Sequence, residues 1–112
     1  MPRFKLVFFS PVSSTKTVLS HLFAKYPHNV GKIGQYEECA FITQGTGQFR
    51  PGPEANPAIG TRGQLEYTDE HRVEVLVTDK GENNEIKGAI EELKKVHPYE
   101  EVAYDVYRLE DF

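Results

Sequence analysis

Two stretches with helical spacing, each closed by a proline, most constrain what this chain can fold into. Apolar residues recur at helical spacing over 18–26 and again over 86–96, which predicts two helices with one apolar face each. Pro27 directly follows the first stretch, Pro98 follows the second after His97, and helical geometry is disfavoured for the residue before a proline. We therefore expect each helix to end just before its proline, and Asn83 or Asn84 to cap the start of the second.

Four segments with strand character surround the two helices. They cover 3–10, 34–43, 64–78 and 102–109 and are rich in aromatic and β-branched residues. The polar run 69–72 interrupts the third and predicts a bulge or a part that projects beyond the sheet. The order β-α-β-β-α-β predicts an α+β, ferredoxin-like fold, a four-stranded antiparallel sheet with both helices on one face. The first and third strands should be central, and residues 1–112 should form one domain.

Residues 45–63 are predicted to form a long Gly/Pro-rich loop between the second and third strands. The stretch has five glycines and three prolines and no periodic apolar pattern. Gly45-Thr46-Gly47 offers backbone N–H groups to an anion, with Arg50 or Arg62 completing the charge. Alternatively, the loop contacts a protein partner, or its glycines and prolines only shape the connection. The spacing fits neither a phosphate-binding loop nor a dinucleotide fingerprint.

Composition narrows the partners and the compartment. The net charge is −4 and the basic residues are scattered, so we expect no nucleic-acid binding. No apolar run approaches the length of a membrane span, so we expect no membrane association. Cys39 is the one cysteine, and the N-terminal region lacks a signal-peptide pattern. The cytoplasm is therefore the predicted location.

A polar cluster at the expected corner between the second helix and the last strand contains His97, Tyr99, Glu100 and Glu101. A histidine with nearby carboxylates can hold a divalent cation, and a tyrosine can pack on a flat ligand. In the structural alternative, Pro98 sets the turn, the tyrosine fills the core or a subunit interface, and a glutamate pairs across subunits. Both alternatives stay open at this point.

Catalysis finds little support in the sequence. A nucleophile–base pair or a carboxylate pair is required, and the only candidates are Cys39 with a histidine and Glu100 with Glu101. Adjacent strand residues point to opposite faces, so the two glutamates would not work together if the strand already begins there. We predict no catalytic residue and favour a non-enzymatic role.

Association of several copies is predicted from the second face of the sheet. The second and third strands carry apolar residues on both faces, for example Tyr36 and Ala40 on one side and Cys39 and Phe41 on the other. One of these faces would be left in water in a monomer, and large exposed apolar patches usually mark association.

Two motifs resemble a known family. The run 31–51, with Gly31-Lys32-Ile33-Gly34-Gln35-Tyr36 and Gly45-Thr46-Gly47, continues to Gly60 and Gly63, and His97-Pro98-Tyr99-Glu100-Glu101 forms the second motif. Together they resemble the small YqfO-type proteins, which are similar to the inserted domain of larger NIF-three-like proteins. His97 to Glu100 also resembles the signature of CutA proteins, which share the ferredoxin-like fold with PII signalling proteins. In one departure, residues 25–30 replace a Gly/Ala-rich turn of the family.

The resemblance implies a homotrimer whose three sheets face a central axis, with loop 45–63 where PII proteins contact partners. The larger relatives bind two metal ions through a main domain that this chain lacks, so their hydrolase or cyclohydrolase labels are not transferred. We expect a trimeric PII/CutA-like binding or regulatory module for a small anion, a nucleotide or a divalent metal ion. The alternatives are a structural or protein-interaction module without a small ligand and, less favoured, a metal-dependent hydrolase. The candidate ligand residues are Tyr36, Gly45, Gly47, Phe49, Arg50, Gly60, Arg62, His97, Tyr99, Glu100 and Glu101.

Overall fold

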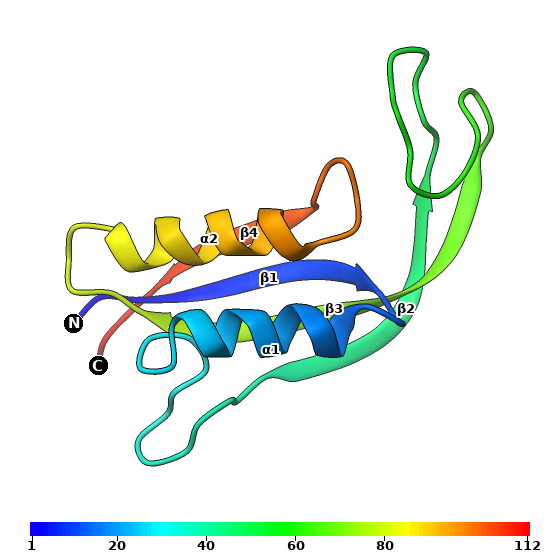
Figure 1. The fold of residues 1–112 in the computed structure, drawn as a ribbon. Helices are drawn as coiled ribbons and strands as arrows, with labels where there is room; N and C mark the ends of the chain where they lie inside the picture. Colours follow the sequence, from blue (N-terminus) through cyan, green and yellow to red (C-terminus); the bar gives the residue numbers. More distant parts are fainter.

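The computed structural model describes residues 1–112 and has the predicted order of elements (Figure 1). These are β1 (Arg3–Pro11), α1 (Thr15–Lys25), β2 (Phe41–Phe49), β3 (Glu66–Thr78), α2 (Asn84–Val96) and β4 (Tyr104–Leu109). The four strands form one antiparallel sheet in the order β2-β3-β1-β4. The ferredoxin-like fold with β1 and β3 central is therefore confirmed. Neither helix has the length and apolar character of a membrane span.

The hydrophobic core lies between one face of the sheet and both helices. Alternate residues of β1 and β3 point into it and meet the apolar stripes of α1 and α2, as the helical spacing predicts. Burying one such side chain contributes about 1.5–3 kcal/mol. The core includes Phe4, Leu6 and Phe8 of β1, Val73, Val75 and Val77 of β3, Val18, Leu19 and Leu22 of α1, and Ile86, Ala89 and Leu93 of α2.

Asn83 is the N-cap residue of α2, as predicted, but the capping hydrogen bonds come from Asp79. Asn83 occupies the N-cap position with a left-handed φ of 65° and makes no side-chain capping bond. The Asp79 carboxylate is fully buried and accepts backbone N–H groups from Gly81, Asn83, Glu85 and Ile86 at 2.8–3.1 Å. One side chain thereby satisfies several of the donors that a helix start leaves unpaired.

The strand β2 lies further along the chain than the sequence predicts. It begins at Phe41 instead of residue 34, and it continues to Phe49 into the segment expected to be loop. Residues 45–49 pair in register with 66–70, so the connecting loop is 50–65 instead of 45–63. This end of β2 is exposed and needs no apolar face. Its Gly-rich sequence therefore lacks the alternating pattern of a strand and looks like a loop. Because the pairing continues without a break across 69–72, the predicted bulge is wrong.

The projecting part, the alternative to that bulge, is present. The β1 strand ends at Pro11, opposite Glu70, whereas β2 and β3 continue as a two-stranded ribbon over 46–49 and 66–69. Figure 1 shows this ribbon bending away from the sheet, on the same side of the molecule as the turn that links α2 to β4. The ribbon gives the molecule its long dimension of 45 Å against 25 Å in the other two.

The outer face of the sheet is more polar than the sequence predicts. Tyr36, Cys39 and Ala40 precede β2, so they do not supply the expected two-sided apolar pattern. The register and the alternation along each strand place charged Lys5, Arg72, Glu74 and Asp105 on this face. Phe41 and Tyr107 also lie there, with exposed fractions of 67% and 50%. Val7, Phe9 and Leu76 share this face with them, so the apolar surface from which association is predicted comes mainly from β1 and β3.

Candidate ligand-binding cleft

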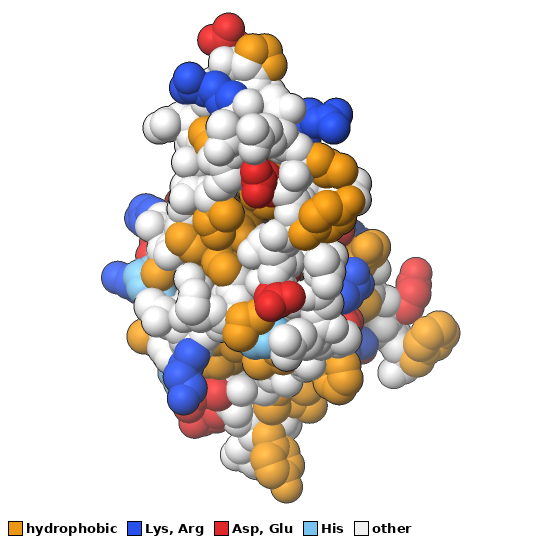
Figure 2. Space-filling model, turned by 90° about the vertical axis from the view of Figure 1, so that its right-hand side faces the viewer, with side chains coloured by type: hydrophobic (Ala, Val, Ile, Leu, Met, Phe, Trp, Pro, Cys, Tyr) orange, Lys and Arg blue, Asp and Glu red, His pale blue; other side chains and the backbone are white.

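A cleft of about 690 Å³ lies where the ribbon bends away from the sheet. Residues 43–52 of β2 and the start of its loop form one wall, and loop residues 57–59 extend it. Phe9 of β1 and the turn residues 99–101 line it from other parts of the chain. Figure 2 shows this end of the molecule, where hydrophobic side chains gather in the middle of the face and Lys and Arg lie toward its margins.

Phe9 and Arg72 form the part of the cleft nearest the sheet. They are paired across β1 and β3 and lie on the outer face, which the helices leave uncovered. The Arg72 guanidinium lies 5.8 Å from the centre of the Phe9 ring and 3.7 Å from a carboxylate oxygen of Glu74. The arginine is thus engaged by a ring and a carboxylate.

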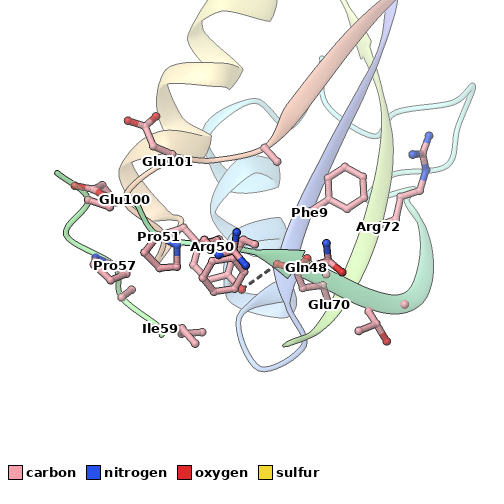
Figure 3. Close-up of a pocket in the computed structure, with 18 of the residues that line it drawn as sticks. Phe9, Gln48, Arg50, Pro51, Pro57, Ile59, Glu70, Arg72, Glu100 and Glu101 are labelled. Carbon is pink, nitrogen blue, oxygen red and sulfur yellow. Dashed lines mark hydrogen bonds between the residues drawn. The ribbon is translucent and has the colours of Figure 1, made fainter. Parts of the chain in front are cut away.

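Tyr99 joins the turn after α2 to the ribbon side of the sheet. Its hydroxyl donates a hydrogen bond of 2.9 Å to Oε2 of Glu70 on β3 (dashed in Figure 3). Burial raises the pKa of Tyr99 to about 12, and the hydrogen bond to the Glu70 carboxylate adds to the rise. The phenol is therefore a neutral donor throughout the physiological pH range.

His97 lies beneath Tyr99 and is a structural anchor. Its side chain is buried, Nε2 donates to the carbonyl oxygen of Phe9 at 2.7 Å, and Nδ1 accepts the backbone N–H of Tyr99 at 3.1 Å. These partners fix the neutral tautomer with the proton on Nε2. Burial lowers the pKa of His97, although the bond to Phe9 acts in the opposite direction.

A divalent cation has no ligand set in this arrangement. Both nitrogens of His97 are engaged with the backbone, and Glu100 accepts the backbone N–H of Asn56 at 2.9 Å. No group of three or more His, Cys, Asp or Glu side chains in the chain is placed to hold a metal ion. The contacts at the corner match the structural alternative for His97.

Seven of the eleven predicted ligand residues line the cleft: Gly45, Gly47, Phe49, Arg50, Tyr99, Glu100 and Glu101. The other four do not. Tyr36 is 77% exposed in a turn paired with Ile33, and His97 lies below the surface. Arg62 donates from Nε to the carbonyl oxygen of Ala55 at 2.5 Å and so fastens the loop to itself, and Gly60 packs near Glu66.

Sequence reasoning missed Phe9, Glu70 and Arg72. Phe9 belongs to a strand that is apolar on both faces, so the pattern does not separate a core residue from a cleft residue. Glu70 and Arg72 lie in the polar interruption 69–72, which is the one signal in the sequence that this part of β3 leaves the core. The catalytic candidate Cys39 lies outside the cleft, and its thiol contacts the carbonyl oxygen of Glu37 at 3.8 Å.

Arg50 is the uncommitted cation of the cleft. It forms no ion pair, whereas Arg72 contacts Glu74. Figure 3 shows Arg50 in the middle of the lining residues, between Pro51 and Gln48, with Glu100 and Glu101 at one side. A guanidinium in this setting can receive a carboxylate or phosphate with two parallel hydrogen bonds.

Solved structures place the fold in a known class. CutA from Archaeoglobus fulgidus, a "periplasmic divalent cation tolerance protein", matches with a TM-score of 0.66 over 98% of this chain and 86% of its own. CutA1 from Pyrococcus horikoshii matches with a TM-score of 0.64 over 97% of this chain and 85% of its own. Their sequence identities are 14% and 16%, so these matches show a shared fold alone.

A second group of proteins matches this chain with much higher sequence identity, which shows homology. A Bacillus cereus "protein related to NIF3" matches with a TM-score of 0.78 and 34% identity over 98% of this chain and 26% of its own. The "GTP cyclohydrolase 1 type 2 homolog" of Halalkalibacterium halodurans is 42% identical over 106 residues, 95% of this chain and 27% of the relative. That of Bacillus subtilis is 45% identical over 80 residues, 71% of this chain and 20% of the relative. No family model matches the chain.

The chain is therefore homologous to one part of NIF3-related proteins, and the resemblance predicted from its motifs is confirmed. It spans about a quarter of the length of these relatives.

Proposed function

We propose that this chain is a cytoplasmic, homotrimeric binding module that takes a small, partly apolar anion in the cleft. The observation that carries the proposal is the cleft itself, in which Arg50 has no ion pair beside apolar walls. Its volume of about 690 Å³ suits a drug-sized or nucleotide-sized ligand. Phe9, Phe49 and Ile59 offer surfaces for a flat or aliphatic group.

The free edges and the outer face of the sheet support the proposal of a trimer. The strands β2 and β4 each have one unpaired edge, and both are mostly exposed. Unpaired edges favour pairing with another chain, and a head-to-tail pairing of two different edges forms a closed ring when the rotation closes. Phe41 and Tyr107 on the outer face would then be covered. Light scattering coupled to gel filtration should give three times the mass of the chain, and a monomer would contradict this part of the proposal.

A protein-interaction module without a small ligand is the second candidate. Ile59, Leu65 and Tyr67 on the ribbon and its loop have exposed fractions of 41%, 43% and 63%. Exposed apolar side chains on a projecting ribbon fit a protein partner. The name of the curated relatives refers to GTP cyclohydrolase, but this chain spans about a quarter of their length, and we do not extend that activity to it.

A ligand screen with matched arginine and lysine variants tests the binding proposal. We would measure thermal unfolding of the purified protein with nucleotides, phosphorylated metabolites, aromatic carboxylates and divalent metal salts. A ligand at one hundred times its Kd stabilises a protein by about 2.7 kcal/mol. Calorimetry on each hit should show binding lost in Arg50→Gln and kept in Lys16→Gln, which removes an exposed cation from α1. A hit that binds both variants equally would contradict the site, and no hit in the panel would favour the protein-interaction candidate.

A further inference from the structure

We infer that Gly47 and Tyr99 are positioning residues that fix the Glu70 carboxylate on the cleft wall and leave Arg50 available to an anion. This inference rests on the proposed function and adds to it the means by which an acidic cleft accepts an anion. Glu70, Glu100 and Glu101 line the cleft together with Arg50 and Arg72, and a Glu70 carboxylate released from its contacts would compete with an anionic ligand for Arg50.

Gly47 makes room for the Glu70 side chain. In the register of the ribbon Glu70 lies opposite Gly45, and its side chain reaches diagonally across to Gly47. A Cβ at Gly47 would lie 1.9 Å from Oε1 of Glu70 and 2.6 Å from its Cδ. A Cβ at Gly45 would meet nothing within 4 Å. The missing side chain therefore matters at Gly47 and is neutral two residues earlier on the same face.

Tyr99 holds the other oxygen of the same carboxylate. Its hydroxyl donates to Oε2 of Glu70 at 2.9 Å, and the tyrosine itself is positioned from below by His97. The two rings meet edge to face with centroids 5.0 Å apart. The Glu70 carboxylate thus lies between Gly47, which leaves space for it, and the Tyr99 hydroxyl, which donates a hydrogen bond to it. The Glu100 carboxylate accepts the backbone N–H of Asn56.

The test measures the Kd of an anionic, flat, largely apolar probe, 8-anilinonaphthalene-1-sulfonate, by fluorescence titration of the full chain. Tyr99→Phe removes the donor and should raise the probe's Kd by about five- to tenfold, because an unpaired carboxylate then competes for Arg50. Glu70→Gln should bind at least as tightly as the wild type. The double variant Tyr99→Phe/Glu70→Gln should recover most of the affinity, since the competing charge is gone. A purely structural role of Tyr99 would give no recovery, and that result would overturn the inference.

Matched glycine variants supply a readout that needs no ligand. Gly47→Ala should give a lower unfolding midpoint than Gly45→Ala, and combining it with Tyr99→Phe should add little, because both changes break the same contact. Gly45→Ala should leave the midpoint unchanged or slightly higher. Equal effects of the two glycine changes, or additive effects of Gly47→Ala and Tyr99→Phe, would refute the positioning role. Failure of the wild type to bind the probe would instead contradict the proposed function.

Discussion

Replacing Asp79 by asparagine, which changes one carboxylate oxygen into an NH2 group, should strongly destabilise the domain. The Asp79 carboxylate is fully buried, and each of its oxygens accepts two backbone N–H groups. An asparagine oxygen can keep the bonds from Gly81 and Asn83. Its NH2 group, however, would face the N–H groups of Glu85 and Ile86, which would lose their acceptor.

The expected cost follows from those two lost bonds. Hydrogen bonds to a charged group contribute about 1.5–3 kcal/mol each, and part of the loss is recovered by local relaxation. We expect Asp79→Asn to lower the free energy of unfolding by about 3 kcal/mol, a large part of the 5–15 kcal/mol typical of a domain. With a slope of about 1.5 kcal/mol per molar urea, the midpoint should fall by about 2 M.

The same carboxylate makes a predictable contribution to acid unfolding. Burial alone would raise the pKa of Asp79, but the four backbone N–H donors outweigh it and lower the pKa below its usual 3.8. A lowered pKa in the folded state means that the contribution is complete above the unfolded-state pKa near 3.8. It is lost as the pH falls through the still lower folded-state pKa. Asp79→Asn should abolish this component of the pH dependence.

Urea unfolding followed by circular dichroism, at one fixed protein concentration, measures these effects. Asp69→Asn on the exposed ribbon is the matched control, since Asp69 is exposed and makes no ion pair. Its midpoint should stay within the error of the wild type. An equal midpoint for Asp79→Asn and the wild type at pH 7 would refute the reasoning that this cap holds the start of α2.

Two further predictions concern His97 and Gly88. Burial lowers the pKa of His97, so its contribution to stability should be complete above pH 6.5 and be lost as the pH falls through the lower folded-state value. The unfolding midpoint of His97→Gln should accordingly change less than that of the wild type between pH 7 and pH 5. Gly88→Ala should destabilise the domain by about 1–3 kcal/mol, because its Cβ would lie 1.8 Å from Oη of Tyr26. In a Tyr26→Ala background the same change should stabilise α2 by up to about 1 kcal/mol, and equal signs in both backgrounds would contradict the contact.

The order of elements could be predicted from the sequence because each element carries its own local pattern. The helical spacing from Val18 and from Ile86 identifies the core faces of α1 and α2, and both faces are buried in the structure. The prolines after each helix mark its end within two residues. These signals depend on neighbours along the chain, and the core follows from them.

The position of β2 could not be predicted in this way. Residues 34–40 look like a strand because they include Tyr36 and Ala40, yet they form turns with left-handed φ values at Gly34 and Glu38. The true strand continues through two glycines, and only its pairing with 66–74 makes it a strand. Such pairing is a property of two distant segments.

Only part of the cleft could be predicted, because it too is formed by segments that are distant in the sequence. Gly47, Arg50 and Tyr99 stood out by composition and by motif, and they do line it. The cleft brings them together with Phe9 and Glu70, which lie far from them in the sequence, and no local pattern predicts that arrangement. His97 looked like a ligand because of its neighbours, whereas both of its nitrogens bind the backbone.

The most direct test of ligand binding in the cleft is a map of amide chemical shifts. We would titrate isotope-labelled protein with 8-anilinonaphthalene-1-sulfonate and follow the backbone amides by NMR. We predict that the largest shifts cluster at Phe9, at 43–52 and at 99–103, and that Arg50→Gln removes them. Shifts confined to the outer edge of β4, or spread evenly over the surface, would contradict a ligand site in the cleft.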